Sequence, residues 1–480
     1  MDGELQMHLA TRPLGRIPAS TPLSGDISRT PSLEGLNASV ALPAPNAGFW
    51  RQLRAFAGPA FLVSVGYMDP GNWATDLQGG ATYRYGLLWV VAAASFIAII
   101  MQILAARLGV VTGKDLAQAC RDFYPVWSRW PLWALCELAI VACDLAEVLG
   151  SAVAINLLFG IPLLWAVVIT AFDVLLLLAL QGLGMRFIEA IILVLVATIG
   201  GCYFIEIFVL PQTQPSFLEM GHALVTPGFR QVGMLGLAIG ILGATVMPHN
   251  LYLHSALVQS RQLRDDAHGI RQAIKFNTID TVAALAVAFL VNAAILVLAA
   301  MVFHGRQSVQ LTSGEVVTYG ESDDWIQVAY LTLAPLLGTA AASVLFAVAL
   351  FASGQSSTIT GTLAGQVVME GFMHWRIRPW VRRLITRSLA IIPVILIIRF
   401  RGERSVTSLM VLSQIVLGLQ LPFAMFPLLH FTSSRKRMGS WCNGWLLLPV
   451  GWICGFLILA LIIYGLPDAL QTAWRVIAGS

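Results

Sequence analysis

The sequence predicts an all-α polytopic membrane protein with about 11 transmembrane helices, built as two inverted repeats of five helices and one additional helix. Of the 480 residues, 57% are hydrophobic and only 11% are charged, and the mean hydropathy is +0.77. Soluble domains are about 45–50% apolar and about 25% charged, so this composition excludes an ordinary water-soluble enzyme. The apolar residues form continuous runs, which excludes the alternating strands of a membrane β-barrel. Proline interrupts two runs at matching places, and this pair of breaks predicts the repeats.

The charge balance and the cysteines exclude further classes of protein. The net charge of +4 is spread along the chain, so we expect no nucleic-acid partner. The six cysteines are scattered and form no CxxC pair, which indicates neither a disulfide framework nor a structural zinc site. We therefore expect no permanently bound cofactor.

The first 48 residues differ in composition from the rest of the chain. They are rich in proline, serine, glycine and charged residues, as loops are. They contain no apolar core behind a basic start, so they do not resemble a cleaved signal peptide. Residues 1–48 are predicted to be a disordered cytoplasmic tail.

Eleven apolar runs follow this tail, and their boundaries carry an error of about 2–4 residues. They are residues 55–82, 87–110, 131–157, 161–182, 187–210, 231–258, 277–303, 338–370, 383–400, 406–430 and 444–465. Ten or twelve spans remain open, because 325–337 could also insert and the last run could only dip into the membrane. The predicted organisation is a first repeat at 49–210, a second repeat at 211–430, and an eleventh helix with an external C-terminus at 431–480.

The lysines and arginines predict the orientation in the membrane. With the tail in the cytoplasm, 18 of them fall in inside loops, Arg382 and Arg383 among them, and 7 fall in outside loops. Cytoplasmic loops carry the excess of positive charge in membrane proteins. We therefore expect a cytoplasmic N-terminus and an external C-terminus, and the short loops favour a bacterial inner membrane.

The first run is interrupted by GYMDPGN (66–72). Pro70 removes a helical hydrogen-bond donor and Gly71 loosens the backbone, so the helix is expected to break there. Irregular backbone at membrane depth persists only where it lines a cavity or is buried in protein.

The sixth run is interrupted by ATVMPHN (244–250), in which Pro248 follows Pro70 by 178 residues. Gly66 and Ala244 stand at the same offset before the two prolines. The simpler explanation of each break is a proline kink whose freed carbonyls are satisfied by a polar side chain. Paired interruptions in corresponding positions of two halves indicate instead a transporter binding site.

The residues at the breaks offer ligands for a cation. A charged Asp69 at mid-membrane is costly unless it is paired with a cation, a proton or a basic group. Asn72 adds a neutral oxygen, and Gly66 and Ala244 could offer backbone carbonyls. Oxygen ligands alone would suit calcium, magnesium or sodium, whereas the Met247 thioether favours softer ions such as manganese, iron, cobalt or cadmium.

Several stretches resemble the signature segments of the Nramp family of divalent-metal transporters. The resemblance covers most of residues 50–430, and the two segments at the breaks carry it most specifically. The stretches are DPGNWATDLQGGA (69–81), LGVVTGKDLA (108–117), CDLAEVLGSAVAINLLFGIP (143–162), GATVMPHNLYLHSALVQSR (243–261), LFASGQSSTITGTLAGQVVMEGF (350–372), LITRSLAIIP (384–393) and SQIVLGLQLPF (413–423).

The resemblance implies a LeuT-like fold and the import of manganese(II) or iron(II), accompanied by protons. Carried over to matching positions, the implied metal ligands are Asp69, Asn72, Met247 and the backbone carbonyls of Gly66 or Ala244. The resemblance adds Gln414 as a ligand in some states of the transport cycle.

Acidic residues of the third run suggest a proton pathway. Asp144 and Glu147 are three residues apart and share a helical face, and Glu137 is a third acid in the same run. The resemblance implies a pathway that leads from Asp69 through these acids, and Arg387 is their expected basic partner. A purely structural network between the acids and the arginine is the alternative interpretation.

His249 and Cys143 lie next to these candidate sites in the sequence. Imidazole titrates near neutral pH, which suits a role of His249 in proton handling better than in metal binding. Cys143 occupies a position at which members of the family usually carry threonine.

Together these features predict a proton-coupled secondary transporter that imports manganese or iron by alternating access, with cobalt and cadmium as further candidates. The alternative is a LeuT-fold transporter of another substrate, such as magnesium or an amino acid. Met247 argues against magnesium, and Asp69 argues against an anionic substrate group. No catalytic pairing indicates an enzyme, and the expected partners are the metal ion, protons and the lipid bilayer around a monomer.

Overall fold

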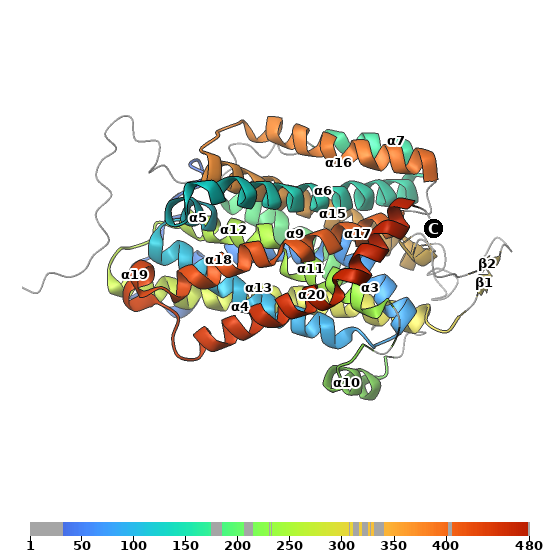
Figure 1. Ribbon diagram of the computed structural model, residues 1–480, viewed down its shortest axis with the longest axis horizontal. Coiled ribbons are helices and arrows are strands. Elements are labelled where there is room, and N and C mark those ends of the chain that lie inside the picture. The colour runs from blue at the N-terminus through green and yellow to red at the C-terminus, as the bar shows by residue number, and fades with distance from the viewer. Residues whose placement is uncertain are drawn as a thin grey trace, which may run out of the picture.

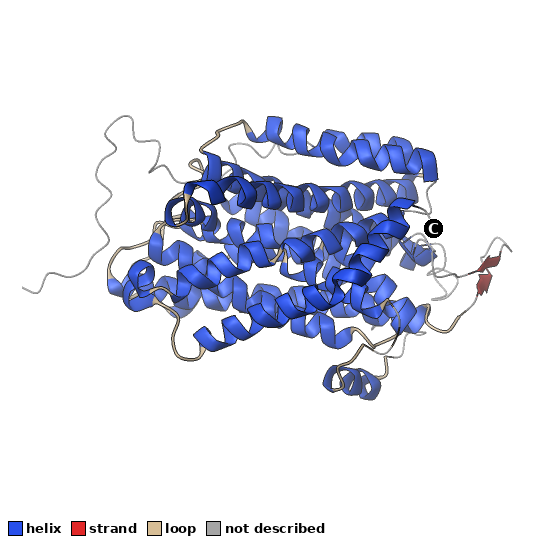
Figure 2. Ribbon diagram, viewed as in Figure 1, coloured by secondary structure: helices blue, strands red, loops and turns tan. Residues whose placement is uncertain are grey.

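The computed structural model describes residues 32–173, 185–205, 215–229, 231, 233–306, 308–310, 316–318, 325–326, 328–330, 340–401 and 406–478. These residues are almost entirely helical, and most helices run along the long axis of the molecule (Figures 1 and 2). Helices α5 and α19 lie at one end of that axis, and a small antiparallel hairpin lies at the other (Figure 1). Its strands are β1 (Ser308–Gln310) and β2 (Val316–Thr318).

The described helices follow the order of the predicted spans. In the first half they are α1 (Phe49–Phe56), α2 (Pro59–Ser64), the 3-10 turn η2 (Val65–Met68), α3 (Pro70–Tyr83), α4 (Leu88–Thr112), α5 (Leu116–Phe123), η3 (Val126–Ser128), α6 (Arg129–Phe159), α7 (Leu163–Ile169), η4 (Thr170–Phe172) and α9 (Met185–Phe204). In the second half they are α10 (Phe217–Val225), α11 (Met234–Val246), α12 (Pro248–Leu257), η6 (Val258–Ser260), α13 (Ala267–Val302), α15 (Ala340–Met373), α16 (Pro379–Arg401), α17 (Val406–Gln420), α18 (Pro422–Ser433), α19 (Arg435–Met438), η8 (Gly439–Trp441) and α20 (Leu447–Ala478).

Within the described residues, eight helical segments are long and apolar enough to cross a membrane. Three other predicted spans correspond to α2 with α3, to α7 with η4, and to α16. The first is divided by its break, and residues 174–182 of the second predicted span lie outside those described. The third carries five arginines, three of which, Arg382, Arg383 and Arg387, are buried inside the protein. The count of about 11 therefore stays a prediction.

Both predicted helix breaks are confirmed. After α2 and η2, the backbone of Asp69 is extended (ψ 166°), and its carboxylate caps the start of α3. Helix α11 ends at Val246, and Met247 has a φ of 21° before α12 begins at Pro248. The positive φ of a residue other than glycine is strained and has to be stabilised by its surroundings.

Helices at corresponding positions of the two halves lie against each other. Helix α4 packs on α13 and α6 packs on α15, which pairs the second and third spans with the seventh and eighth. The two broken helices also meet, through η2 with α11 and α2 with α12. Such contacts are expected when two repeats are related by a two-fold axis that runs between them.

The N-terminal segment is more ordered than the predicted tail. Residues 1–31 lie outside those described, but residues 38–43 contact the segment that follows α12. The backbone of Val40 pairs with that loop at 2.9 Å on both sides, and Leu33 donates from its N–H to Glu370 Oε2 at 3.0 Å. Leu33 and Val40 are buried. Backbone pairing with a distant loop orders this segment, and composition does not report such pairing.

Candidate metal-binding site

The two helix breaks meet at the centre of the candidate site. Asp69 and Met247, one at each break, are fully buried. A Cβ atom on Gly66 would lie 2.2 Å from Nδ2 of Asn250 and 3.2 Å from Sδ of Met247, so only glycine allows this approach. Asn250 Nδ2 also lies 3.4 Å from the Met247 sulfur, to which it donates. The thioether is thereby held beside the first break.

The prolines release one backbone carbonyl at each break. A helical carbonyl accepts from the N–H four residues later, and Pro70 and Pro248 stand four residues after Gly66 and Ala244. Proline has no N–H, so neither carbonyl can make its helical hydrogen bond. Gly66 and Ala244, the two residues whose carbonyls were predicted as ligands, are both buried.

Two buried side-chain oxygens near the first break have no hydrogen-bond partner among the described residues. The Asp69 Oδ1 atom accepts from the N–H of Asn72 at 2.8 Å, whereas Asn72 Oδ1 has no partner among the described residues. Gln414 on α17 approaches from another side, since a Cβ on Gly71 would lie 1.9 Å from its Nε2 atom. The Gln414 Oε1 atom likewise has no partner. Unsatisfied buried acceptors are rare, and a cation would satisfy them.

The donor set at the breaks is mixed. Among the described residues, no group of three or more His, Cys, Asp or Glu side chains is placed to hold a metal. A cation bound here would therefore depend on a single carboxylate, amide oxygens, freed carbonyls and sulfur. This composition suits transition ions better than magnesium or calcium.

Cys143 on α6 joins the breaks to a second cluster of polar side chains. Its Sγ atom lies 3.6 Å from Asp69 Oδ2 and 3.8 Å from Glu147 Oε1. The thiol is buried between the two carboxylates. Cys143 therefore contacts both Asp69 at the first break and Glu147 on α6.

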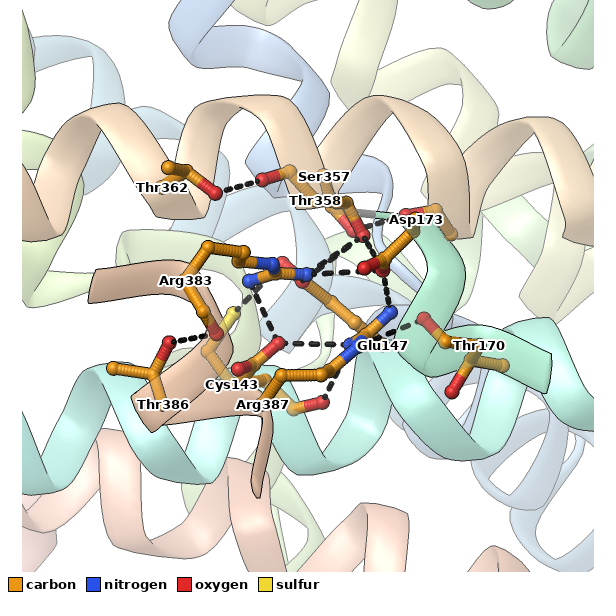
Figure 3. A network of polar contacts seen from close by, with 12 residues as sticks. Cys143, Glu147, Thr170, Asp173, Ser357, Thr358, Thr362, Arg383, Thr386 and Arg387 are labelled. Carbon is orange, nitrogen blue, oxygen red and sulfur yellow. Dashed lines mark hydrogen bonds and ion pairs between the residues drawn. The ribbon is translucent and has the colours of Figure 1, made fainter. Parts of the chain in front are cut away.

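The second cluster, which we call the acid–arginine network, consists of Asp144, Glu147, Asp173, Arg383 and Arg387. Figure 3 shows Glu147, Asp173, Arg383 and Arg387 of this network close to one another. Arg383 lies 2.8 Å from Asp144 Oδ1, 3.1 Å from Glu147 Oε2 and 3.4 Å from Asp173 Oδ2. Arg387 lies 2.8 Å from Asp144 Oδ1 and also pairs with Asp173. All five side chains are buried. Three carboxylates face two guanidinium groups, so the fully ionised network has one uncompensated negative charge.

Comparison with known proteins identifies the family. The model of the family described as Nramp, natural resistance-associated macrophage protein-like, matches residues 60–468. The chain belongs to the Nramp family. This confirms the resemblance seen in the sequence.

Relatives in the Nramp family match over most of their length. A divalent metal cation transporter MntH of Nostoc sp. is 50% identical over 446 residues, which are 92% of this chain and 97% of the relative. The MntH of Bradyrhizobium diazoefficiens is 48% identical over 447 residues, 93% of this chain and 96% of the relative.

Solved structures confirm the fold. The manganese transporter of Eremococcus coleocola superposes with a TM-score of 0.80 at 36% identity, covering 93% of this chain and 96% of that one. The nucleobase-cation-symport-1 transporter Mhp1 superposes with a TM-score of 0.53 at 13% identity, covering 87% of this chain and 93% of that one. The second match shows the fold alone, and it supports the predicted LeuT-like architecture.

One sequence prediction about the network needs correction. Arg387 does pair with Asp144, but the partner of Glu147 is Arg383, which stands at the edge of the predicted span 383–400 and which the charge count assigns to an inside loop. Helix α16 begins at Pro379, several residues before the apolar run, and carries Arg383 into the protein. Arg383 precedes Arg387 by four residues, so both lie on one face of the helix. This spacing can be read from the sequence and would have predicted Arg383 as a second basic partner.

Two other acids and His249 differ in their relation to the acid–arginine network. Asp173, at the end of η4, was not predicted to join the network, and Glu137 pairs instead with Arg382 at 2.8 Å. His249 is buried in the first turn of α12, and its Nδ1 atom has no partner among the described residues. No hydrogen bond or ion pair between described residues joins it to the acid–arginine network, so its place in a proton pathway stays a prediction.

Proposed function

We propose that this chain is a proton-coupled secondary transporter that imports divalent transition-metal ions, with manganese(II) and iron(II) as its main substrates. One observation carries the proposal. Two interrupted helices meet at a buried carboxylate and a thioether, and two oxygen acceptors beside the first break have no partner among the described residues. The relatives named above, a divalent metal cation transporter and a manganese transporter, support the same substrate class.

The proposed metal ligands are Asp69, Asn72, Met247 and the freed carbonyls of Gly66 and Ala244. Asp69 supplies the only formal charge among these groups. The sulfur of Met247 binds soft transition ions better than it binds calcium or magnesium, so it sets selectivity. Gln414 is proposed to join when α17 closes on the site, because its Oε1 atom accepts no hydrogen bond from the described residues.

Alternating access follows from the two breaks. The segments before and after each break are short helices that can tilt independently, whereas an unbroken helix would have to move as one body. In our proposal these half-helices rearrange around the bound ion and expose it first to one side of the membrane and then to the other. The N-terminus is proposed to be cytoplasmic and the C-terminus external, in a bacterial inner membrane.

The proposed proton route runs from Asp69 to the acid–arginine network. Cys143 lies within hydrogen-bonding distance of Asp69 and Glu147, and Glu147 lies beside Arg383. The uncompensated negative charge of the network is costly in a buried site, and one proton would neutralise it. We propose that Asp144 and Arg387 belong to this route and that His249 assists at the metal site.

Uptake into proteoliposomes tests the metal site. The purified protein is reconstituted with an internal metal-sensitive dye, and an inward manganese gradient is applied. Asp69→Asn should abolish manganese entry, because it removes the charged ligand. Glu219→Gln, which changes an acid on α10 that pairs with Arg84 at the surface, is the matched control and should transport normally. Manganese entry that persists in Asp69→Asn would refute the ligand assignment.

An internal pH dye separates the proton route from the metal site. Glu147→Gln should reduce proton entry more than metal binding, and equal loss of both would favour a purely structural network. In the same vesicles Met247→Ala should allow calcium or magnesium to compete with manganese. Unchanged selectivity in that variant would show that the sulfur is not a ligand.

A further inference from the structure

The proposed transport mechanism uses Cys143 as a hydrogen-bond partner but does not use its thiol as a metal ligand. It lies on α6, opposite the first helix break, and its side chain is buried. The Sγ atom lies 3.6 Å from Asp69 Oδ2 and 3.8 Å from Glu147 Oε1. Figure 3 shows the sulfur of Cys143 beside the arginines and Glu147, at the edge of the acid–arginine network. Its position relative to Asp69 suggests a second role as a metal ligand.

The distance from Cys143 to Asp69 suits two ligands of one ion. Zinc-like ions lie about 2.3 Å from a cysteine sulfur and about 2.1 Å from a carboxylate oxygen. With these bond lengths, the observed separation of 3.6 Å between sulfur and oxygen corresponds to an angle of about 110° at the ion, which is close to tetrahedral. An ion on Asp69 Oδ2 could therefore also bind Cys143 without movement of either helix.

A second sulfur beside Cys143 supports a site for soft ions. Cys143 and Met247 belong to the same small cluster of buried side chains, to which Leu417 also contributes. The oxygen acceptors of Asn72 and Gln414 have no partner among the described residues. The site would thus offer two sulfurs, one carboxylate oxygen and two amide oxygens.

We propose that Cys143 is a selectivity-determining metal ligand that joins Asp69 when a soft divalent ion such as Cd²⁺ occupies the site. The proposal rests on the proposed function, because it assigns a further ligand to the same site. Thiolate ligands favour soft ions, whereas Mn²⁺ prefers oxygen. With Mn²⁺ bound, the thiol keeps its proton and remains a hydrogen-bond donor.

Binding of a soft ion replaces the proton on the Cys143 sulfur. The Sγ–H bond of Cys143 breaks, a bond from sulfur to the metal forms, and the proton passes to Glu147 Oε1, 3.8 Å away. No electron transfer is involved. When the ion leaves, the proton returns to the sulfur.

Competition uptake and direct binding test the proposal. In proteoliposomes, Cys143→Ser should weaken the inhibition of manganese uptake by Cd²⁺ about tenfold or more, a larger change than any it makes in the manganese uptake measured without Cd²⁺. Cys136→Ser, which changes a buried cysteine on the same helix, is the matched control and should leave both unchanged. An equal loss of both metals in Cys143→Ser would mean that the thiol only positions Asp69, and would overturn the proposal.

Titration of the purified protein with Cd²⁺ gives a readout that does not depend on transport. A thiolate bound to cadmium has an ultraviolet charge-transfer band. We expect this band in wild type and in Cys136→Ser and its loss in Cys143→Ser. A band that survives in Cys143→Ser would overturn the assignment of Cys143. Absence of manganese and cadmium uptake by wild-type vesicles, with the band present, would instead contradict the proposed function alone.

Discussion

Arg383 should be the side chain on which the acid–arginine network depends most. The variant Arg383→Gln removes the guanidinium that lies between Asp144, Glu147 and Asp173, all within 3.4 Å of it. Only Arg387 then opposes three buried carboxylates. Breaking a buried ion pair by removing one partner destabilises a protein by about 3–5 kcal/mol, because a buried charge loses its compensation. We expect a loss of that size in the free energy of unfolding.

Unfolding in mixed micelles with a rising fraction of denaturing detergent measures this loss. The matched control is Arg376→Gln, because the exposed fraction of Arg376 is 42% and that of its partner Glu34 is 65%. An exposed ion pair contributes about 0–1 kcal/mol. If Arg383→Gln is no more destabilising than Arg376→Gln, Arg383 does not stabilise the protein by compensating the buried carboxylates.

The double variant Arg383→Gln/Glu147→Gln tests the cause of the loss. It removes one of the carboxylates that the single variant leaves uncompensated. We therefore expect it to be more stable than Arg383→Gln alone, and the difference to exceed the error of the measurement. If the two substitutions instead add to a larger loss, lost packing rather than uncompensated charge explains the result.

Three further predictions concern other parts of the fold. Burial raises the pKa of Asp115, which caps α5, to about 6. Its stabilising contribution is therefore present below its ordinary pKa of about 4 and is lost as pH rises through about 6. Asp115→Asn keeps the cap and should remove up to about 3 kcal/mol of pH dependence from unfolding curves between about pH 4 and 8; an unchanged profile would contradict this. A Cβ on Gly80 would lie 2.2 Å from a backbone oxygen of α13, whereas one on Gly200 would have nothing within 4 Å. Gly80→Ala should therefore lower the free energy of unfolding by about 1–3 kcal/mol and Gly200→Ala should not, and equal effects would refute the steric argument. Val40→Pro removes a backbone N–H that bonds to the loop after α12, so it should speed cleavage of residues 32–43 by a nonspecific protease, whereas Glu34→Gln should not.

The sequence predicted best the features that depend on a short segment alone, which are the helix breaks and the membrane spans. Proline removes a donor wherever it stands, so Pro70 and Pro248 located both breaks, and the polar residues beside them located the candidate site. The length of the apolar runs located most of the spans for a similar reason, because a helix must cross a fixed thickness of hydrocarbon. None of these predictions required knowledge of which helices are neighbours.

The rest depends on contacts between distant segments. Arg383 was placed in a loop because cations beside an apolar run usually remain at the surface, and only the acids on α6 and Asp173 explain its burial. The positive-inside rule counts charges and cannot distinguish a loop cation from a buried partner. Residues 32–48 were expected to be disordered for the same reason, since their backbone partners lie more than two hundred positions away.

At both helix breaks a proline interrupts the backbone, but the two breaks carry different side chains and so offer different kinds of metal ligand. Both release a carbonyl four residues before a proline. The first break adds a charged oxygen at Asp69, and the second adds a sulfur at Met247 that packs with Cys143. Gly66 has to lack a side chain so that Met247 and Asn250 can approach, whereas Ala244 keeps its methyl group. A site formed from two identical breaks would offer one kind of ligand twice. In the proposed site the first break supplies the charged ligand and the second supplies the soft one, so we expect selectivity for transition ions to require that both breaks close on the ion together.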